Sequence, residues 1–400
     1  MPPSTASTSR LKKAISLVNP SLLSIHSSLP PNAYVLGIDA SVRCSGIALV
    51  NAQTGAPFRV AISRTQTKAP PLFAGGRLAA AVRAICSSRT VDPVRIIETS
   101  LEEIPMQFKA SSSSSMTRFA LARVNGVAAY ECWKFSGGAP VQFHYPNAMR
   151  SFFGIKPQRK TIQCNNEEGE LLMSSSSSST KSNDNKKAVL EKILSLQPNL
   201  LTGIEEVVAK SGSQGVADEF KSPMAWLEGN SSLLRVLTQK EANATKFDVA
   251  DATLAALYGL ATHLTFRTAI SENGRVFATV AEEMFPKNSN MLQSIIDYHV
   301  KSCLIEEARE RLQPGQEDLS INEEIDASIR TKKKMTRTTL KRVLVLPSST
   351  VEKDPEILES PPRTLEEIER NYRKVRTLFD KACQSILLSG SVFPLWNRFM

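Results

Sequence analysis

The chain has 400 residues, of which 42% are hydrophobic and 22% charged, so it exceeds one ordinary domain and is neither wholly disordered nor collagen-like. Its net charge of +10 favours a polyanionic partner such as nucleic acid. No apolar run reaches the roughly 18 residues that a membrane-spanning helix needs, so we expect no membrane partner. Six cysteines without a CxxC pair, beside four histidines, argue against a zinc site and a disulfide framework.

The first segment has the composition of a targeting peptide. Residues 1–38 contain no Asp or Glu, are rich in Ser, and carry Arg10, Lys12 and Lys13 in a stretch that can form a basic amphipathic helix. We predict that residues 1–33 are an organelle transit peptide, for a mitochondrion or alternatively a plastid, or else a disordered tail.

Residues 34–270 have the pattern of a mixed α/β domain. The apolar run YVLGI ends at Asp39, and GIALV and FRVAIS follow after short turns, which predicts a three-stranded meander. Next come a helix, the strand VRII ending at Glu98, a second helix, the strand PVQFHY, and the apolar helix DVADATLAALYGLATHL. We expect a mixed five-stranded sheet flanked by helices.

Two further regions differ from this domain. Residues 159–187 are polar and contain the run SSSSSST, which indicates a low-complexity insertion. Residues 271–400 carry equal numbers of acidic and basic side chains and include a probable long helix near the end. We predict a partly helical C-terminal extension there, without a predicted function.

The acidic residues stand at the points where elements begin or end. Asp39 and Glu98 each close an apolar strand, while Asp248 and Asp251 open the last helix, three residues apart on one face. Each acid alone is also an ordinary turn or helix-cap residue. Four converging carboxylates would repel one another unless a cation lay among them, and oxygen ligands suit Mg²⁺ or Mn²⁺. Two such ions can promote phosphodiester hydrolysis.

Four segments occur in the order found in a known family. GIDASVRCSGIALV, VRIIETSL, LARVNGVAAYEC and FDVADATLAALYGLA resemble motifs of the RuvC family of Holliday junction resolvases, and the resemblance spans residues 34–266. It implies a ribonuclease H-like three-layer fold. It also implies a homodimer that binds branched DNA and resolves four-way junctions as a Mg²⁺-dependent endonuclease, here in organelle DNA recombination and repair.

The resemblance also assigns site residues. It implies that two Mg²⁺ ions per subunit, with Mn²⁺ as a substitute, are bound by the catalytic carboxylates Asp39, Glu98, Asp248 and Asp251. Lys187 and Arg150 stand where basic residues would contact the DNA.

The chain departs from the family at two points, and these leave alternatives open. Ala40-Ser41 replaces the usual Pro-Gly after the first Asp, and the longer loop after Glu98 leaves Glu102 or Glu103 as an alternative second acid. A non-catalytic RuvC-like component of an organelle ribosome or nucleoid is one alternative function. An ATP-dependent kinase of actin-like fold is another, although no second Gly-rich phosphate loop is evident in the sequence.

Overall fold

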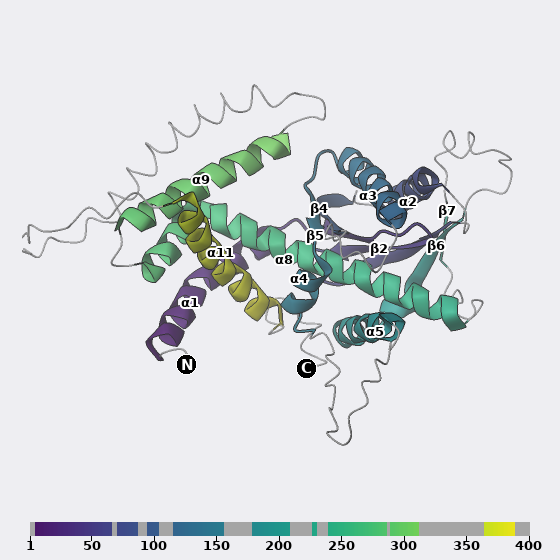
Figure 1. Cartoon of the computed structure of the whole chain (residues 1–400), viewed down its shortest axis with the longest axis horizontal. Helices are drawn as coiled ribbons and strands as arrows, with labels where there is room; N and C mark the ends of the chain where they lie inside the picture. The colour runs from purple at the N-terminus through teal and green to yellow at the C-terminus, as the bar shows by residue number, and fades with distance from the viewer. Residues whose placement is uncertain are drawn as a thin grey trace, which may run out of the picture. The chain divides into compact units, whose positions relative to one another are not determined.

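A computed structural model of the chain forms two compact units (Figure 1). The α/β unit comprises residues 29–261 and 387–400, and the helical unit comprises residues 1–28 and 262–386. No helix among the described residues is long and apolar enough to cross a membrane. The structure describes residues 5–65, 70–86, 94–103, 115–155, 178–208, 226–229, 239–285, 289–311 and 364–388.

The α/β unit is built on one mixed sheet. Its seven strands lie in the order β5-β4-β1-β2-β3-β6-β7. Strands β1 to β3 form the predicted antiparallel meander, and β4 and β5 continue the sheet parallel to β1. The strands are β1 (Ala33–Asp39), β2 (Cys44–Asn51), β3 (Pro57–Arg64), β4 (Arg95–Glu102), β5 (Val141–His144), β6 (Ile204–Val208) and β7 (Trp226–Gly229).

The prediction of a mixed sheet flanked by helices is confirmed, and all five predicted strands form, as β1 to β5; two strands that were not predicted, β6 and β7, extend the sheet to seven. Strand β6 pairs in parallel with β3, and β7 pairs with β6, which extends the sheet beyond the meander. Both strands are short, and neither has a long alternation of apolar and polar residues. The local sequence therefore did not distinguish them from loop. Their strand conformation depends on hydrogen bonds to a neighbouring strand rather than on local propensity.

Alternation along the central strands separates two faces of the sheet. Leu36 and Ile38 of β1 point to the face covered by α2 (Pro71–Cys86) and α3 (Ser115–Phe135), where they join a core that includes Leu78. Gly37, between them, points to the opposite face and meets α8 (Gln239–Met284). The sheet is therefore covered on both sides, as the predicted helices required.

Further helices of the α/β unit follow β5 and precede β6 along the chain. They are α4 (Pro146–Phe152), α5 (Ser178–Leu196) and the 3₁₀ helix η1 (Leu200–Gly203). Helices α4 and α5 carry the basic residues considered below. Because α5 begins at Ser178, the predicted insertion at 159–187 overlaps it, and residues 156–177 lie outside the described residues.

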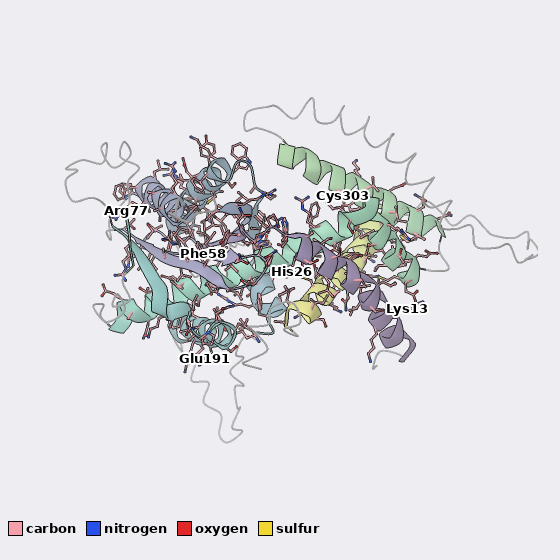
Figure 2. All side chains as sticks on the ribbon, turned by 180° about the vertical axis from the view of Figure 1, so that it is seen from behind. Lys13, His26, Phe58, Arg77, Glu191 and Cys303 are labelled. Carbon is pink, nitrogen blue, oxygen red and sulfur yellow. The ribbon has the colours of Figure 1, made fainter. Side chains whose placement is uncertain are left out.

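The helical unit contains the leader segment as a packed helix. Ala14, Val18 and Leu22 of α1 (Thr5–Ser28) recur every four residues and are buried. On the solvent side, the Nζ of Lys13, labelled in Figure 2, lies 2.7 Å from a carboxylate oxygen of Glu283. The reading of this segment as a disordered tail is therefore wrong for α1, because its apolar face is covered within the unit. Its role in targeting stays a prediction.

The rest of the helical unit comes from the C-terminal part of the chain. It comprises the end of α8, α9 (Ser289–Arg311) and α11 (Leu365–Leu388). The unit begins at Thr262, within α8, which is earlier than the expected boundary at residue 271. The described part of the extension is helical, as predicted, whereas residues 312–363 and 389–400 lie outside the described residues.

Candidate active site

The carboxyl ends of β1 and β4 bring two acids together. The strands are parallel, and Ile38 pairs with Leu101, so Asp39 and Glu102 follow one step further along the same register. Parallel neighbours in register point to the same face. Both acids therefore lie at one edge of the sheet, on the face that α8 covers.

The structure places Glu98 away from this edge. Glu98 pairs with Val35, four residues before Asp39, which corresponds to about 13 Å along a strand. The preference for Glu98 as the second acid is therefore corrected, and the alternative, Glu102, lies beside Asp39. Glu98 itself is buried, with 1% of its surface exposed.

A register shift explains why the sequence pattern was misleading. Between the pairs Tyr34–Ile96 and Val35–Glu98, β4 contains one extra residue, Ile97. This bulge breaks the alternation of apolar and polar residues. Strand β4 also continues to Glu102 through side chains that are polar yet buried, including Thr99 and Ser100. The strand consequently seemed to end at Glu98.

Close packing of α8 on the sheet positions the other two acids. A Cβ atom on Gly46 of β2 would lie 2.1 Å from the carbonyl oxygen of Asp248, and one on Gly37 would lie 2.1 Å from that of Ala252. Such distances are impossible for any residue with a side chain, so the two glycines let the α8 backbone lie directly on the sheet. Asp248 and Asp251 are thereby held at the edge that carries Asp39.

Burial and mutual repulsion raise the pKa of these carboxylates. Burial, then the charges of Glu102, Asp251 and Asp248, raises the pKa of Asp39 well above its ordinary value. Burial, then the Asp251 charge, raises the pKa of Glu102 to about 7. Burial also raises the pKa of Asp251, to about 6. The four acids thus form one electrostatically connected group, which we call the acid cluster (Asp39, Glu102, Asp248 and Asp251).

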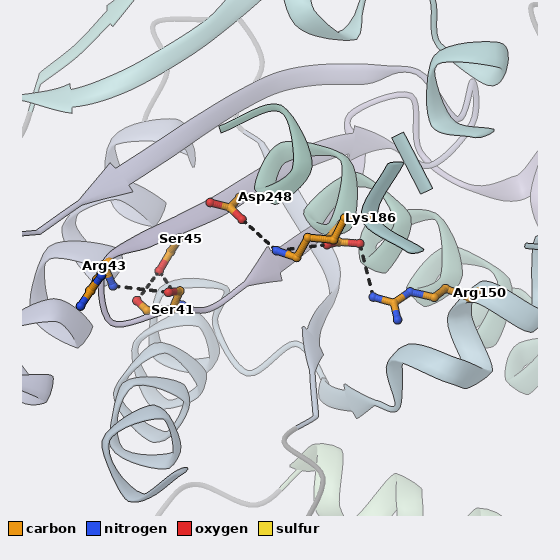
Figure 3. Close-up of polar contacts among 7 residues, drawn as sticks. Ser41, Arg43, Ser45, Arg150, Lys186 and Asp248 are labelled. Carbon is orange, nitrogen blue, oxygen red and sulfur yellow. Dashed lines mark hydrogen bonds and ion pairs between the residues drawn. The ribbon is translucent and has the colours of Figure 1, made fainter. Parts of the chain in front are cut away.

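Two basic side chains reach the acid cluster (Figure 3). The Nζ atom of Lys186 on α5 lies 3.4 Å from Asp248 Oδ1 and 3.9 Å from Asp251 Oδ2. Arg150 on α4 lies 3.9 Å from Asp251 Oδ1. Burial lowers the pKa of Lys186, but the surrounding carboxylate charges outweigh this and raise it overall, so the ammonium stays charged.

The resemblance implied that Lys187 and Arg150 contact DNA. Arg150 reaches the acid cluster, but the lysine that does so is Lys186 rather than Lys187. Lys187 is 71% exposed and forms an ion pair at 3.8 Å with Glu191, one turn along α5. Lys186 precedes the buried Val189 and Ile193 by three and seven residues, so it shares the inward face of the helix. Helical periodicity in NKKAVLEKIL was the signal that could have distinguished the two lysines.

Hydrogen bonds fix the chain on either side of the acid cluster. The buried Asn125 of α3 donates from Nδ2 to the carbonyl of Glu102 at 3.1 Å, which anchors the end of β4. In the turn after Asp39, the Ser45 hydroxyl donates to the Ser41 carbonyl at 2.9 Å and accepts from the Ser41 N–H at 3.0 Å (Figure 3). These two hydrogen bonds close the turn that contains Ala40 and Ser41, the two residues that stand in place of Pro-Gly.

The acid cluster suits a hard divalent cation in its donor chemistry, because carboxylate oxygens are the ligands that Mg²⁺ and Mn²⁺ prefer. Among the described residues, however, no group of three or more Asp, Glu, His or Cys side chains is already gathered closely enough to hold a metal ion. The compensating positive charge comes instead from Lys186 and Arg150. The donor set fits the cation, and binding would require the side chains to move closer together.

No protein-family model matches the sequence, and no curated protein matches it. Among solved structures, the chain is similar to RuvC of T. thermophilus in complex with a Holliday junction substrate, at 13% identity and a TM-score of 0.32. A second Thermus thermophilus RuvC structure is similar at 11% identity and a TM-score of 0.30. Each similarity covers 58% of this chain and 96% of the other.

Proposed function

We propose that the chain is a divalent-metal-dependent endonuclease of RuvC-like, ribonuclease H-like type, with four-way DNA junctions as its substrate. The observation that carries the proposal is the acid cluster. Buried carboxylates that raise one another's pKa cost folding free energy, and such groups are concentrated at functional sites. Three of the four acids also belong to the two motifs, GIDASVRCSGIALV and FDVADATLAALYGLA, that most resemble the RuvC family.

Within this proposal, each charged residue has a role. The acid cluster (Asp39, Glu102, Asp248 and Asp251) would hold two Mg²⁺ ions, or Mn²⁺ in their place. When bound, the ions supply water activation and stabilise the leaving oxygen. Lys186 offsets the carboxylate charge before metal binds and attracts a phosphate afterwards. The guanidinium of Arg150 can bind a phosphodiester oxygen with paired N–H donors.

A homodimer is part of the proposal, because two opposed cuts in one junction need two active sites related by a two-fold axis. The outer face of α3 supports a self-association surface. Phe119 and Tyr130, about three turns apart on one side of the helix, are 63% and 52% exposed. Sedimentation should give a dimer, and Tyr130→Asp should give a monomer.

A cleavage assay tests the function directly. The purified chain is incubated with a labelled four-way junction in Mg²⁺, with linear duplex, flap and RNA–DNA hybrid beside it. We expect paired cuts in the junction alone, and none with EDTA or with Asp39→Asn. Binding without cleavage in either Mg²⁺ or Mn²⁺ would instead favour the non-catalytic ribosome or nucleoid component. ATP consumption without cleavage would favour the kinase.

We also propose organelle localisation, with the mitochondrion ahead of the plastid. Residues 1–33 fused to a fluorescent protein should direct it to the organelle, and a diffuse cytosolic signal would contradict this. Removal of the whole segment would strip buried Val18 and Leu22 from the helical unit. We therefore expect the mature N-terminus, read by mass spectrometry, to retain α1.

A further inference from the structure

Helix α11, yellow in Figure 1, carries a row of cations along one side. Arg370, Lys374 and Lys381 are all exposed. Each residue turns an α-helix by about 100°, so these three positions lie within about 40° of one another around the helix axis. We call them the basic stripe (Arg370, Lys374 and Lys381). It extends about 16 Å along the helix, and the exposed Thr377 lies on the same side between its members.

The opposite side of α11 holds the basic stripe in place. The ring of the buried Phe379 stacks on that of Phe277, with ring centroids 5.8 Å apart. The Nζ of Lys374 donates to Oδ1 of the buried Asn371 at 2.9 Å, and Asn371 Nδ2 donates to the sulfur of Met291 on α9 at 3.5 Å. The apolar side of α11 is thus packed inside the helical unit, so a lipid bilayer is a poor partner for this helix, whereas the stripe faces solvent.

The acidic residues of α11 leave the basic stripe largely uncompensated. Glu366 and Glu367 lie in the first turn, where the helix dipole favours negative charge. Glu369 forms an ion pair at 3.4 Å with Arg373, at the margin of the stripe. Asp380 lies at least about 80° around the axis from each member of the stripe. In the described part of the chain, no carboxylate forms an ion pair with the stripe.

This charge pattern costs helix stability and fits a polyanion. Arg370 and Lys374 are one turn apart, and like charges at this spacing destabilise a helix. A surface that serves solubility alone carries both signs interspersed. Arg, Lys and Thr side chains are the groups that contact DNA phosphates in protein complexes. At about 3.4 Å of rise per nucleotide, the length of the stripe corresponds to about five phosphates of one strand.

We propose that the basic stripe binds the phosphodiester backbone of duplex DNA, as a contact of the helical unit additional to the candidate active site. The identity of the ligand rests on the proposed nuclease function, but the contact itself is measured by binding alone. Phosphate contacts carry no sequence information and are available in every duplex. The stripe should therefore raise affinity for junction and linear duplex alike, and should leave the choice of junctions and the chemical step to the α/β unit.

The test uses the full-length chain carrying Asp39→Asn, so that binding is measured without cleavage. The stripe variant combines Arg370→Gln, Lys374→Gln and Lys381→Gln. Anisotropy titrations at several salt concentrations give its affinity for a four-way junction and for a linear duplex. We expect both affinities to fall about 10-fold or more at low salt, with their ratio unchanged. The slope of log affinity against log salt concentration should become shallower by about 2 to 3.

A matched control removes the same charge elsewhere in the helical unit. Lys12 on α1, Arg275 on α8 and Lys301 on α9 are also exposed. The scattered variant combines Lys12→Gln, Arg275→Gln and Lys301→Gln. Its salt slope should change by less than the roughly 0.9 that one phosphate contact contributes. Melting temperatures of both variants check that these surface substitutions leave the fold intact.

The outcomes separate this inference from the proposed function. If the stripe variant keeps the parent affinity and salt slope, the stripe does not bind DNA, and an acidic protein becomes the better partner. Equal losses in the stripe and scattered variants would reduce the effect to net charge, and the inference would also fail.

Cleavage gives an independent measurement. With Asp39 intact, the stripe variant should cut junctions at the parent rate when protein is saturating, and should need more protein to reach saturation. A lower rate at saturation would assign the stripe to the chemical step and contradict the inference. If the unsubstituted chain cuts no junction while the stripe variant alone loses DNA affinity, the nuclease proposal fails and the stripe stands.

Discussion

The α/β unit and the helical unit bury polar side chains in different ways. In the α/β unit, four acids converge at one edge of the sheet. Burial raises the pKa of each, and repulsion from the other carboxylates adds to this at Asp39, Glu102 and Asp251. In the helical unit, the buried His299 is stacked on Phe277, with ring centroids 3.7 Å apart, and its Nε2 lies 3.1 Å from the Ala269 carbonyl. Burial lowers the pKa of His299 to about 3, so it is neutral at pH 7.

The difference indicates which buried polar groups serve stability and which serve chemistry. A neutral, hydrogen-bonded imidazole inside an aromatic core contributes to packing. Clustered carboxylates oppose folding, and a stable protein has no structural reason to keep them together. Substitutions in the α/β unit should therefore change activity more than stability, and substitutions in the helical core should do the reverse.

The largest expected effect is on cleavage by the acid cluster. Asp39→Asn, Glu102→Gln, Asp248→Asn or Asp251→Asn should each lower the junction-cleavage rate by about 10² or more, because each removes a metal ligand. The free energy of unfolding, measured in urea without metal, should stay constant or rise, since repulsion is relieved. Junction affinity, measured by anisotropy, should persist.

Glu98→Gln is the matched control for these variants, because Glu98 lies on the same strand and face but away from the acid cluster. It should retain the cleavage rate, even if burial of the new amide lowers stability. Loss of cleavage in Glu98→Gln together with normal cleavage in Glu102→Gln would reverse the assignment of the second acid.

The helical unit should respond in stability. Leu22→Ala removes a fully buried side chain from α1 and should lower the unfolding free energy by about 2–5 kcal/mol. Leu23→Ala, at the neighbouring position that is 42% exposed, should change it by less than about 0.5 kcal/mol. Equal effects of the two substitutions in urea denaturation would show that α1 does not pack as described.

A glycine substitution tests whether packing of α8 positions the acids. Gly46→Ala places a methyl group against the Asp248 carbonyl and should cost about 1–3 kcal/mol, with a parallel loss of cleavage as Asp248 shifts. Gly126→Ala, with nothing within 4 Å of the added methyl, should be neutral or stabilising by up to about 1 kcal/mol. Thermal melts and cleavage rates are measured for both variants. Equal results for Gly46→Ala and Gly126→Ala would show that packing at Gly46 does not position Asp248.

Substitutions of the two adjacent lysines should have smaller effects on the cleavage rate, and these effects should differ between the two positions. Lys186→Met removes the cation nearest Asp248 and Asp251, and we expect cleavage to fall about tenfold, with weaker phosphate binding. Lys187→Met removes an exposed charge paired with Glu191 and should change the rate by less than about twofold. A larger effect at Lys187 would favour Lys187 instead, the residue that the resemblance assigned.

The smallest expected effect is on the pH dependence of stability. The pKa of Glu102 is about 7 in the folded chain against an ordinary 4.5, and that of Asp251 is about 6 against 3.8. At a pH between the ordinary pKa and the raised pKa of each acid, the folded state binds more protons than the unfolded state. The unfolding free energy should therefore fall as pH rises from about 4 to 7. In metal-free urea titrations, Glu102→Gln should flatten this fall by about 1–2 kcal/mol. An unchanged slope would contradict the raised pKa of Glu102.

Part of this organisation could be predicted from local pattern. The β1 strand ending at Asp39, the meander, and the apolar helix with Asp248 and Asp251 were predicted because alternation, turns and helical spacing are short-range properties. The convergence of Asp39 with those two acids followed from where strands end and helices begin. The resemblance to the RuvC family also named Arg150, although as a DNA contact, and that role stays a prediction.

Tertiary structure decided what local pattern left open. A single bulged residue, Ile97, sets which glutamate reaches Asp39, and pairing with β3 makes a strand of β6. The inward face of α5 selects Lys186 over its neighbour, and packing in the helical unit orders α1. The register of β4, the rotation of α5 about its axis and the burial of the apolar face of α1 all depend on contacts with residues distant in the chain. A local window of sequence does not contain those residues.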